Sequence, residues 1–199
     1  MCTSRQVSLR IEALMVLTIA SLLVALSGCG GVKPNDRRSE EAVAVLFDRL
    51  CEIGARENPG ESNETRMRRV DDKIEEVLSR VTSASILRDL YIQCEEFLEA
   101  KRGRWDEVDR LQDVLGDARP IILGKIGDMR NDEAARVLAK DLLGSSKLSF
   151  DGESAINIMN AITTCGRPCL KYLIEIGGER QSFVRKMIGA IERGEILGP

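Results

Sequence analysis

Apolar residues recur at helical spacing along three consecutive segments between residues 39 and 102. They follow an i, i+3, i+4, i+7 pattern, which puts them on one face of an α-helix with charged residues opposite. The three faces comprise Val43, Leu46, Phe47, Leu50 and Ile53; Met67, Val70, Ile74, Val77, Leu78 and Val81; and Leu87, Leu90, Tyr91, Cys94, Phe97 and Leu98. Because short links force neighbouring helices to pack side by side, the pattern predicts an all-α fold with an antiparallel long-helix bundle over 39–102.

Polar residues and helix breakers mark the ends of these three helices. Ser39 is a suitable N-cap for the first, and Asn58-Pro59-Gly60 stops it. Ser62 or Asn63 is expected to start the second helix, and the third is expected to start near Ala84.

From residue 103 to residue 199 the expected helices are shorter. Gly116 is expected to end one that carries Trp105, and Pro120 to open the next, since the first turn does not need its missing N–H. Asn131 is expected to cap a helix that Gly144 ends, and residues 144–152 form a loop. Later helices carry Ala155, Ile158, Met159 and Ile162; Leu170, Leu173 and Ile176 after Pro168; and Phe183, Val184, Met187, Ile188 and Ile191. Gly178 and Gly194 lie near helix ends, where a left-handed residue is favoured.

A weak repetition occurs within this second half. Arg119-Pro120-Ile121-Ile122 and Arg167-Pro168-Cys169-Leu170 both begin expected helices, and a glycine break and a second helix follow each. The stretch from Ala155 to Arg185 resembles a HEAT-type repeat. That resemblance, over about residues 117–194, implies stacked helix pairs in a short α-solenoid. Ordinary helix punctuation is the alternative explanation.

The N-terminal segment has the three parts of a secretory signal. Arg5 and Arg10 precede an uncharged apolar run over residues 13–26, which is too short to span a bilayer comfortably. The run closes with Leu26-Ser27-Gly28-Cys29, which resembles the lipobox of bacterial lipoproteins. The resemblance implies recognition of Leu26, Ser27 and Gly28 by a signal peptidase, removal of residues 1–28, and a covalent lipid on the Cys29 sulfur. An uncleaved membrane helix is the alternative.

A lipid on Cys29 would anchor the protein to a bacterial membrane. Lipoproteins of this kind carry two or three acyl chains, and more than one chain is needed for stable anchoring. Residues 29–38 are rich in glycine and charge and are expected to act as a flexible tether. Gly30 in place of aspartate after the lipid site favours the outer membrane where there are two. The domain would then face the periplasm or the exterior.

Composition excludes several classes of function. The chain has no histidine, which removes Ser-His-Asp and Cys-His catalysis and the commonest metal ligand. The net charge is −3, and loss of residues 1–28 leaves about −4 with charges of both signs interspersed, so no nucleic-acid partner is expected. Neighbouring carboxylates such as Glu95 and Glu96 point about 100° apart on a helix, so we interpret them as solvated faces.

Four cysteines remain in the expected mature domain besides Cys29. Cys51 and Cys94 fall on apolar helix faces and are interpreted as small buried hydrophobes. Cys165 and Cys169 flank the turn Gly166-Arg167-Pro168, which allows either a local disulfide or a reactive thiol pair. No metal site is expected, because zinc would need further soft ligands.

These observations predict a lipid-anchored helical scaffold that binds another envelope protein. No catalytic residue and no cofactor other than the lipid on Cys29 are expected. A thiol-active or redox protein that uses Cys165 and Cys169 is one alternative. A carrier of small apolar ligands, with a pocket lined by leucine and methionine, is the other.

Overall fold

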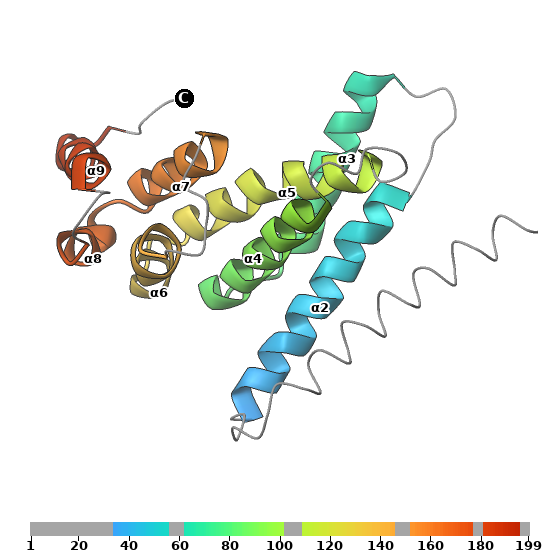
Figure 1. The fold of residues 1–199 in the computed structure, drawn as a ribbon, viewed down its shortest axis with the longest axis horizontal. Helices are drawn as coiled ribbons and strands as arrows, with labels where there is room; N and C mark the ends of the chain where they lie inside the picture. Colours follow the sequence, from blue (N-terminus) through green and yellow to red (C-terminus); the bar gives the residue numbers. More distant parts are fainter. Residues whose placement is uncertain (1–33, 56–61, 102–108, 146–151, 177–180, 196–199) are drawn as a thin grey trace, which may run out of the picture. The chain divides into compact units, whose positions relative to one another are not determined.

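The computed structural model describes residues 34–55, 62–101, 109–145, 152–176 and 181–195. These residues form helices joined by turns and contain no strand, so the predicted all-α fold is confirmed (Figure 1). The elements are α2 (Pro34–Ala55), α3 (Asn63–Leu78), α4 (Ala84–Lys101), α5 (Asp109–Asp128), α6 (Asp132–Arg136), the π-helix η1 (Val137–Leu143), α7 (Gly152–Cys165), the 3-10 turn η2 (Arg167–Cys169), α8 (Leu170–Ile174) and α9 (Gln181–Arg193).

The three long helices follow the apolar pattern of the sequence. The side chains predicted to face the core in α3 and α4 include Ile74, Leu78, Leu87 and Leu90, and all four are fully buried. Ser62 caps α3, since its Oγ accepts a hydrogen bond from the Thr65 N–H at 3.3 Å. The predicted starts of these two helices are therefore confirmed.

The start of α2 differs from the prediction. The helix begins at Pro34 rather than after Ser39, so residues 34–38 of the expected tether form its first turns. Proline favours the first helical position because its φ is already helical and the N–H that it lacks would have no partner there. The preference of Pro34 for the first helical position therefore outweighs the N-cap preference of Ser39.

The structure also corrects the prediction of two helices around Pro120. α5 runs without interruption through Gly116 and Pro120. Its residues Leu115, Ile122 and Ile126 are fully buried, and α3, α4 and α7 all pack on it. Burial on several sides holds the helix together across a residue that ordinarily breaks one.

Helix ends in the second half follow the local signals. The Asn131 side chain caps α6 by accepting from the Ala134 N–H at 2.8 Å, as predicted. The helix that it begins continues as η1 and ends at Gly144. Gly194 ends α9 with a φ of 72°, and Pro168 lies in the short 3-10 turn that leads into α8. Trp105, Leu148, Phe150 and Gly178 lie outside the described residues.

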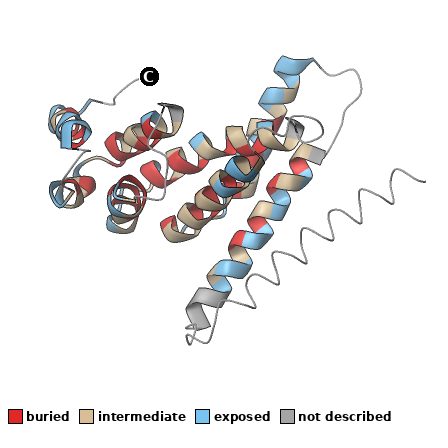
Figure 2. Ribbon diagram, viewed as in Figure 1, coloured by how far each residue is buried: buried red, intermediate tan, exposed pale blue. Residues whose placement is uncertain are grey.

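The helices contact one another in two series. α3 packs on α5, α5 on α7 and α7 on α9, while α4 packs on α6 and η1, and η1 on α8. α4 also packs on α5, and α8 on α9. Figure 2 shows the buried residues concentrated on α4 to α7, and most of them belong to one hydrophobic cluster. The helices before residue 102 and those from Asp109 onward therefore share one core.

Candidate functional site

The predicted lipidation site lies outside the described residues. This applies to Cys29 and to Leu26, Ser27 and Gly28 of the expected peptidase recognition sequence. Among the helices of the described ranges, none is both long and apolar enough to span a bilayer.

Cys165 and Cys169 lie together at the junction of α7 and α8. Cys165 is the last residue of α7, Cys169 ends η2, and both are buried with free thiols. Gly166 makes the turn between them with φ 75° and ψ −139°, a conformation that glycine adopts without strain. Cys169 follows Cys165 by four residues, at the other end of this turn, and the two thiols interact. The structure thus places this predicted pair in one buried turn as two free thiols.

The pKa values of the two thiols are shifted in opposite directions. Interaction with the Cys169 thiol lowers the pKa of Cys165, burial opposes this shift, and the positive charge of Arg130 assists it. The same interaction raises the pKa of Cys169, and burial raises it further. Cys165 is therefore the thiol of the pair that loses its proton first.

Cys165 also lines a cavity of about 540 Å³, which we call the thiol pocket. The pocket is lined by Arg130, Thr163, Thr164, Cys165, Gly166, Arg167, Ile191, Glu192, Arg193, Gly194 and Glu195. Arg193 is paired with Glu195 at 2.8 Å, whereas Arg130 and Arg167 make no ion pair with any residue that the structure describes. The pocket therefore presents two free guanidinium groups near a buried thiol.

The other described cysteines are poor candidates for chemistry. Burial raises the pKa of Cys51 to about 11 and that of Cys94 to about 12, and the charge of Cys51 contributes to the second shift. Because the thiolate is the nucleophile, these shifts make both thiols less reactive near neutral pH. Cys94 is fully buried and Cys51 is half-buried.

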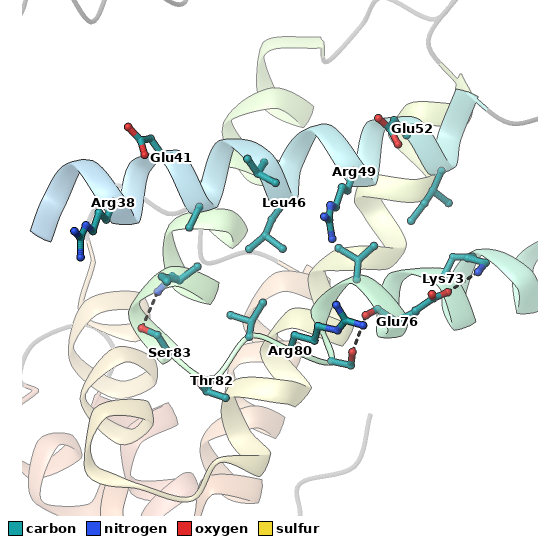
Figure 3. A pocket seen from close by; sticks show the side chains of 17 residues that line it. Arg38, Glu41, Leu46, Arg49, Glu52, Lys73, Glu76, Arg80, Thr82 and Ser83 are labelled. Atoms are coloured by element: carbon teal, nitrogen blue, oxygen red, sulfur yellow. Dashed lines mark hydrogen bonds and ion pairs between the residues drawn. The ribbon is translucent and has the colours of Figure 1, made fainter.

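A larger groove lies between α2 and the connection from α3 to α4. Its volume is about 830 Å³, and we call it the α2 groove (Figure 3). Apolar side chains form part of its lining, namely Ala42, Val45, Leu46, Ile53, Val77, Val81 and Ile86. Charged side chains complete it: Arg38, Glu41, Arg49, Glu52, Lys73, Glu76 and Arg80. This lining contains one leucine and no methionine among the described residues. It therefore differs from the leucine- and methionine-lined pocket expected of a carrier of small apolar ligands.

The α2 groove has an excess of unpaired positive charge. Lys73 is paired with Glu76, and hydrogen bonding to Lys73 lowers the pKa of the Glu76 carboxyl. Arg38, Arg49 and Arg80 make no ion pair with any described residue, although the charge of Arg80 contributes to the lowered pKa of Glu76. Figure 3 shows Arg49 and Arg80 pointing into the groove from opposite walls. An anionic group between these guanidiniums would be stabilised by both.

A partly buried polar network links α4, α5 and α7, and sequence analysis did not predict it. The Glu95 carboxylate accepts from Arg119 at 2.9 Å and from the Ser154 hydroxyl at 3.1 Å. Burial, with the charge of Glu95, raises the pKa of Tyr91 well above its usual value. Glu95 was interpreted above as part of a solvated face, but it is half-buried because Arg119 and Ser154 pack on it. Both partners are distant in the sequence, so the local pattern does not indicate these contacts. The residues of this network connect helices and do not line the thiol pocket or the α2 groove.

The described part of the chain contains no cluster of three or more metal-ligating side chains. Comparison of the chain with models of protein families, with curated proteins and with solved structures gave no match. The α2 groove and the thiol pocket are the cavities of the described residues that we consider as candidate sites, because the first presents unpaired guanidinium groups and the second a cysteine.

Proposed function

We propose that this protein is a lipid-anchored component of a bacterial envelope whose helical domain binds a segment of another envelope protein. The observation that carries the proposal is the α2 groove, which combines an apolar lining with unpaired guanidinium groups. The lipobox-like Leu26-Ser27-Gly28-Cys29 supports the location, because a lipid on Cys29 would hold the groove near a membrane surface.

The order of helix contacts supports HEAT-like stacking as the architecture of this scaffold. Alternate helices contact one another along the chain, from α3 through α5 and α7 to α9, as successive helix pairs in a stacked array would. Such an array is extended, so it leaves grooves between helices that can bind a peptide segment.

The chemistry of the groove specifies the kind of segment that it would bind. Val45 lines the groove and is 53% exposed, an apolar surface that a partner can cover. Arg49 and Arg80 provide fixed positive charge beside it. An amphipathic segment with an apolar face flanked by glutamate or aspartate would satisfy both features. We therefore propose an acidic amphipathic segment as the occupant.

The groove is tested with two matched synthetic helices and the full chain in detergent. Both peptides carry leucine at helical spacing, and one has glutamate where the other has lysine. We expect the acidic peptide to bind at least about tenfold more tightly in fluorescence anisotropy, because the guanidinium groups attract its glutamates and repel the lysines of the other peptide. The double variant Arg49→Glu with Arg80→Glu should remove this preference. Equal binding of the two peptides would contradict the proposed occupant.

A matched control and a separate assay complete the test. Arg185→Glu reverses an exposed charge on α9 and should leave peptide binding unchanged. The anchor is tested independently, because Cys29→Ser should give an uncleaved precursor without lipid in a bacterial host. Normal processing of that variant would overturn the anchor while leaving the result for the groove intact.

A further inference from the structure

The thiol pocket contains a nucleophile that the proposed scaffold function does not use. Cys165 lines the cavity, and Cys169 is fully buried four residues further along the chain, where its thiol interacts with that of Cys165. Gly166, with a φ of 75°, makes the turn that joins the two residues. Two buried thiols in one turn, of which one lines an open cavity, have the arrangement of an attacking and a resolving thiol.

Arg130 supplies a second, independent observation at the same place. It is the one non-glycine residue with a positive φ among the described ranges, and its φ is 46°. Such backbone costs energy and persists where the surrounding structure imposes it, often at functional sites. Its positive charge acts on the Cys165 sulfur, and its guanidinium has no carboxylate partner. This residue therefore lines the same pocket as Cys165 and has a guanidinium that can bind an anion.

Arg167 adds a second free guanidinium to the lining of the thiol pocket. It follows Gly166 directly, is exposed, and makes no ion pair with a described residue. Guanidinium groups bind carboxylates with paired, charge-assisted hydrogen bonds. Two such groups beside a thiol favour a thiol reagent that carries carboxylates.

We propose that Cys165 and Cys169 form a redox-active dithiol whose co-substrate is a small disulfide bearing carboxylates, with Arg130 and Arg167 binding the carboxylates. Cys165 is the attacking thiolate and Cys169 is the resolving thiol. This activity is separate from peptide binding in the α2 groove, since the two sites share no lining residue.

The reaction balances as two thiol–disulfide exchanges. The Cys165 thiolate attacks one sulfur of the disulfide RSSR, the S–S bond breaks, and one RS⁻ leaves with the electron pair. Cys169 then loses its proton to the departing thiolate or to water, and its sulfur attacks Cys165 of the mixed disulfide. The second RS⁻ leaves, so the protein dithiol is oxidised by two electrons and RSSR is reduced to two RSH.

The acidities of the thiols agree with these roles. The pKa of Cys165 is lowered, whereas burial raises the pKa of the more accessible Cys51 to about 11. If solvent exposure determined reactivity, Cys51 would react first. If the fraction of thiolate determined it, Cys165 would react first. Cys51 is therefore an internal control within the same molecule.

The test treats the reduced full chain with glutathione disulfide near neutral pH and follows each cysteine by peptide mass spectrometry. We expect the peptides with Cys165 and Cys169 to become linked, with a loss of about 2 Da, at least about tenfold faster than Cys51 takes up glutathione. Cys169→Ser should accumulate glutathione on Cys165, and Cys165→Ser should leave Cys169 unreactive. Faster modification of Cys51 than of Cys165 would overturn the proposal.

A second pair of measurements tests the arginines and separates reactivity from misfolding. The double variant Arg130→Gln with Arg167→Gln should slow the reaction with glutathione disulfide about tenfold, and the reaction with uncharged hydroxyethyl disulfide much less. Equal slowing with both reagents would reject carboxylate binding. Circular dichroism of each variant should match the parent chain, and Arg185→Gln, which removes an exposed positive charge of α9 outside the pocket, should retain the rate.

Discussion

Gly127 in α5 approaches Ala161 in α7 so closely that a Cβ atom on Gly127 would lie 2.8 Å from the Ala161 carbonyl oxygen. Real Cβ atoms essentially never come within 3.0 Å of another heavy atom in this way. The two helices therefore meet through their backbones, at the most extensive helix contact among the described residues. Glycine permits this approach because it has no side chain.

We expect Gly127→Ala to destabilise the protein, although alanine is the better helix former. The added methyl group would push α7 away from α5, and overpacking of this kind costs about 1–3 kcal/mol. The gain in helix propensity, about 1 kcal/mol, offsets only part of that cost. Urea unfolding followed by far-UV circular dichroism measures the net change in the free energy of unfolding.

Gly124 provides the matched control on the same helix. A Cβ atom at Gly124 would have no heavy atom within 4 Å. Gly124→Ala is therefore expected to stabilise the protein by about 0.5–1 kcal/mol, the usual gain for this change inside a helix. Equal effects of the two substitutions would mean that α5 and α7 are not held at this distance.

Local signals in the sequence were sufficient to predict most helices and several of their caps. Ser62 and Asn131 act on N–H groups three residues further along the chain, and the buried faces of α3 and α4 follow a fixed period. Both kinds of signal depend on neighbouring residues alone. These elements could therefore be predicted without knowledge of the tertiary fold.

Features that depend on distant residues could not be predicted in this way. α5 continues through Pro120 because other helices bury it, and Glu95 meets Arg119 only in the folded chain. For the candidate sites, Cys165 and Cys169 could be paired from their spacing. Arg130 could not, because its place beside them depends on the packing of α6 and α7. The α2 groove has the same origin, since its walls come from separate helices.

The carboxylate of Glu133 in α6 caps the N-terminus of α4. It accepts hydrogen bonds from the Ser85 N–H at 2.9 Å, the Ser85 hydroxyl at 2.9 Å and the Ser83 hydroxyl at 3.1 Å. Burial alone would raise the pKa of Glu133, but these hydrogen bonds lower it below its usual value of 4.5. The interaction links two helices through one ionised side chain.

The stability that Glu133 provides should therefore depend on pH in a known direction. Because the pKa is lower in the folded state, the contribution is present above 4.5 and is lost as the pH falls through the folded value. Glu133→Gln should lower the free energy of unfolding by about 1–2 kcal/mol at neutral pH. The difference from the parent chain should shrink in acid.

Urea unfolding at neutral pH and again well below 4.5 tests this prediction. Glu40→Gln is the control, since Glu40 is exposed and makes no ion pair with a described residue. It should change the stability by less than about 0.5 kcal/mol at either pH. A constant deficit for Glu133→Gln across the pH range would show that shape, and not charge, determines the effect of the substitution.

Pro120 interrupts the hydrogen bonding of α5 without interrupting the helix. It has no N–H to donate to the carbonyl of Gly116, and its side chain is exposed, so no buried contact requires it. Pro120→Ala would restore the hydrogen bond and remove the steric clash, which together cost about 3 kcal/mol in an ordinary helix. The freer unfolded chain would reduce the gain by about 0.4–1 kcal/mol.

We therefore expect Pro120→Ala to raise the free energy of unfolding by about 2–2.5 kcal/mol, measured by urea unfolding. The sign of this change in stability distinguishes a continuous α5 from two helices that meet at Pro120. If Pro120 opened a second helix, it would lie in a first turn, where proline is favourable, and alanine would leave the stability unchanged or lower it. A stabilised variant is the result that a continuous α5 requires, since only an interior proline removes a hydrogen bond that alanine can restore.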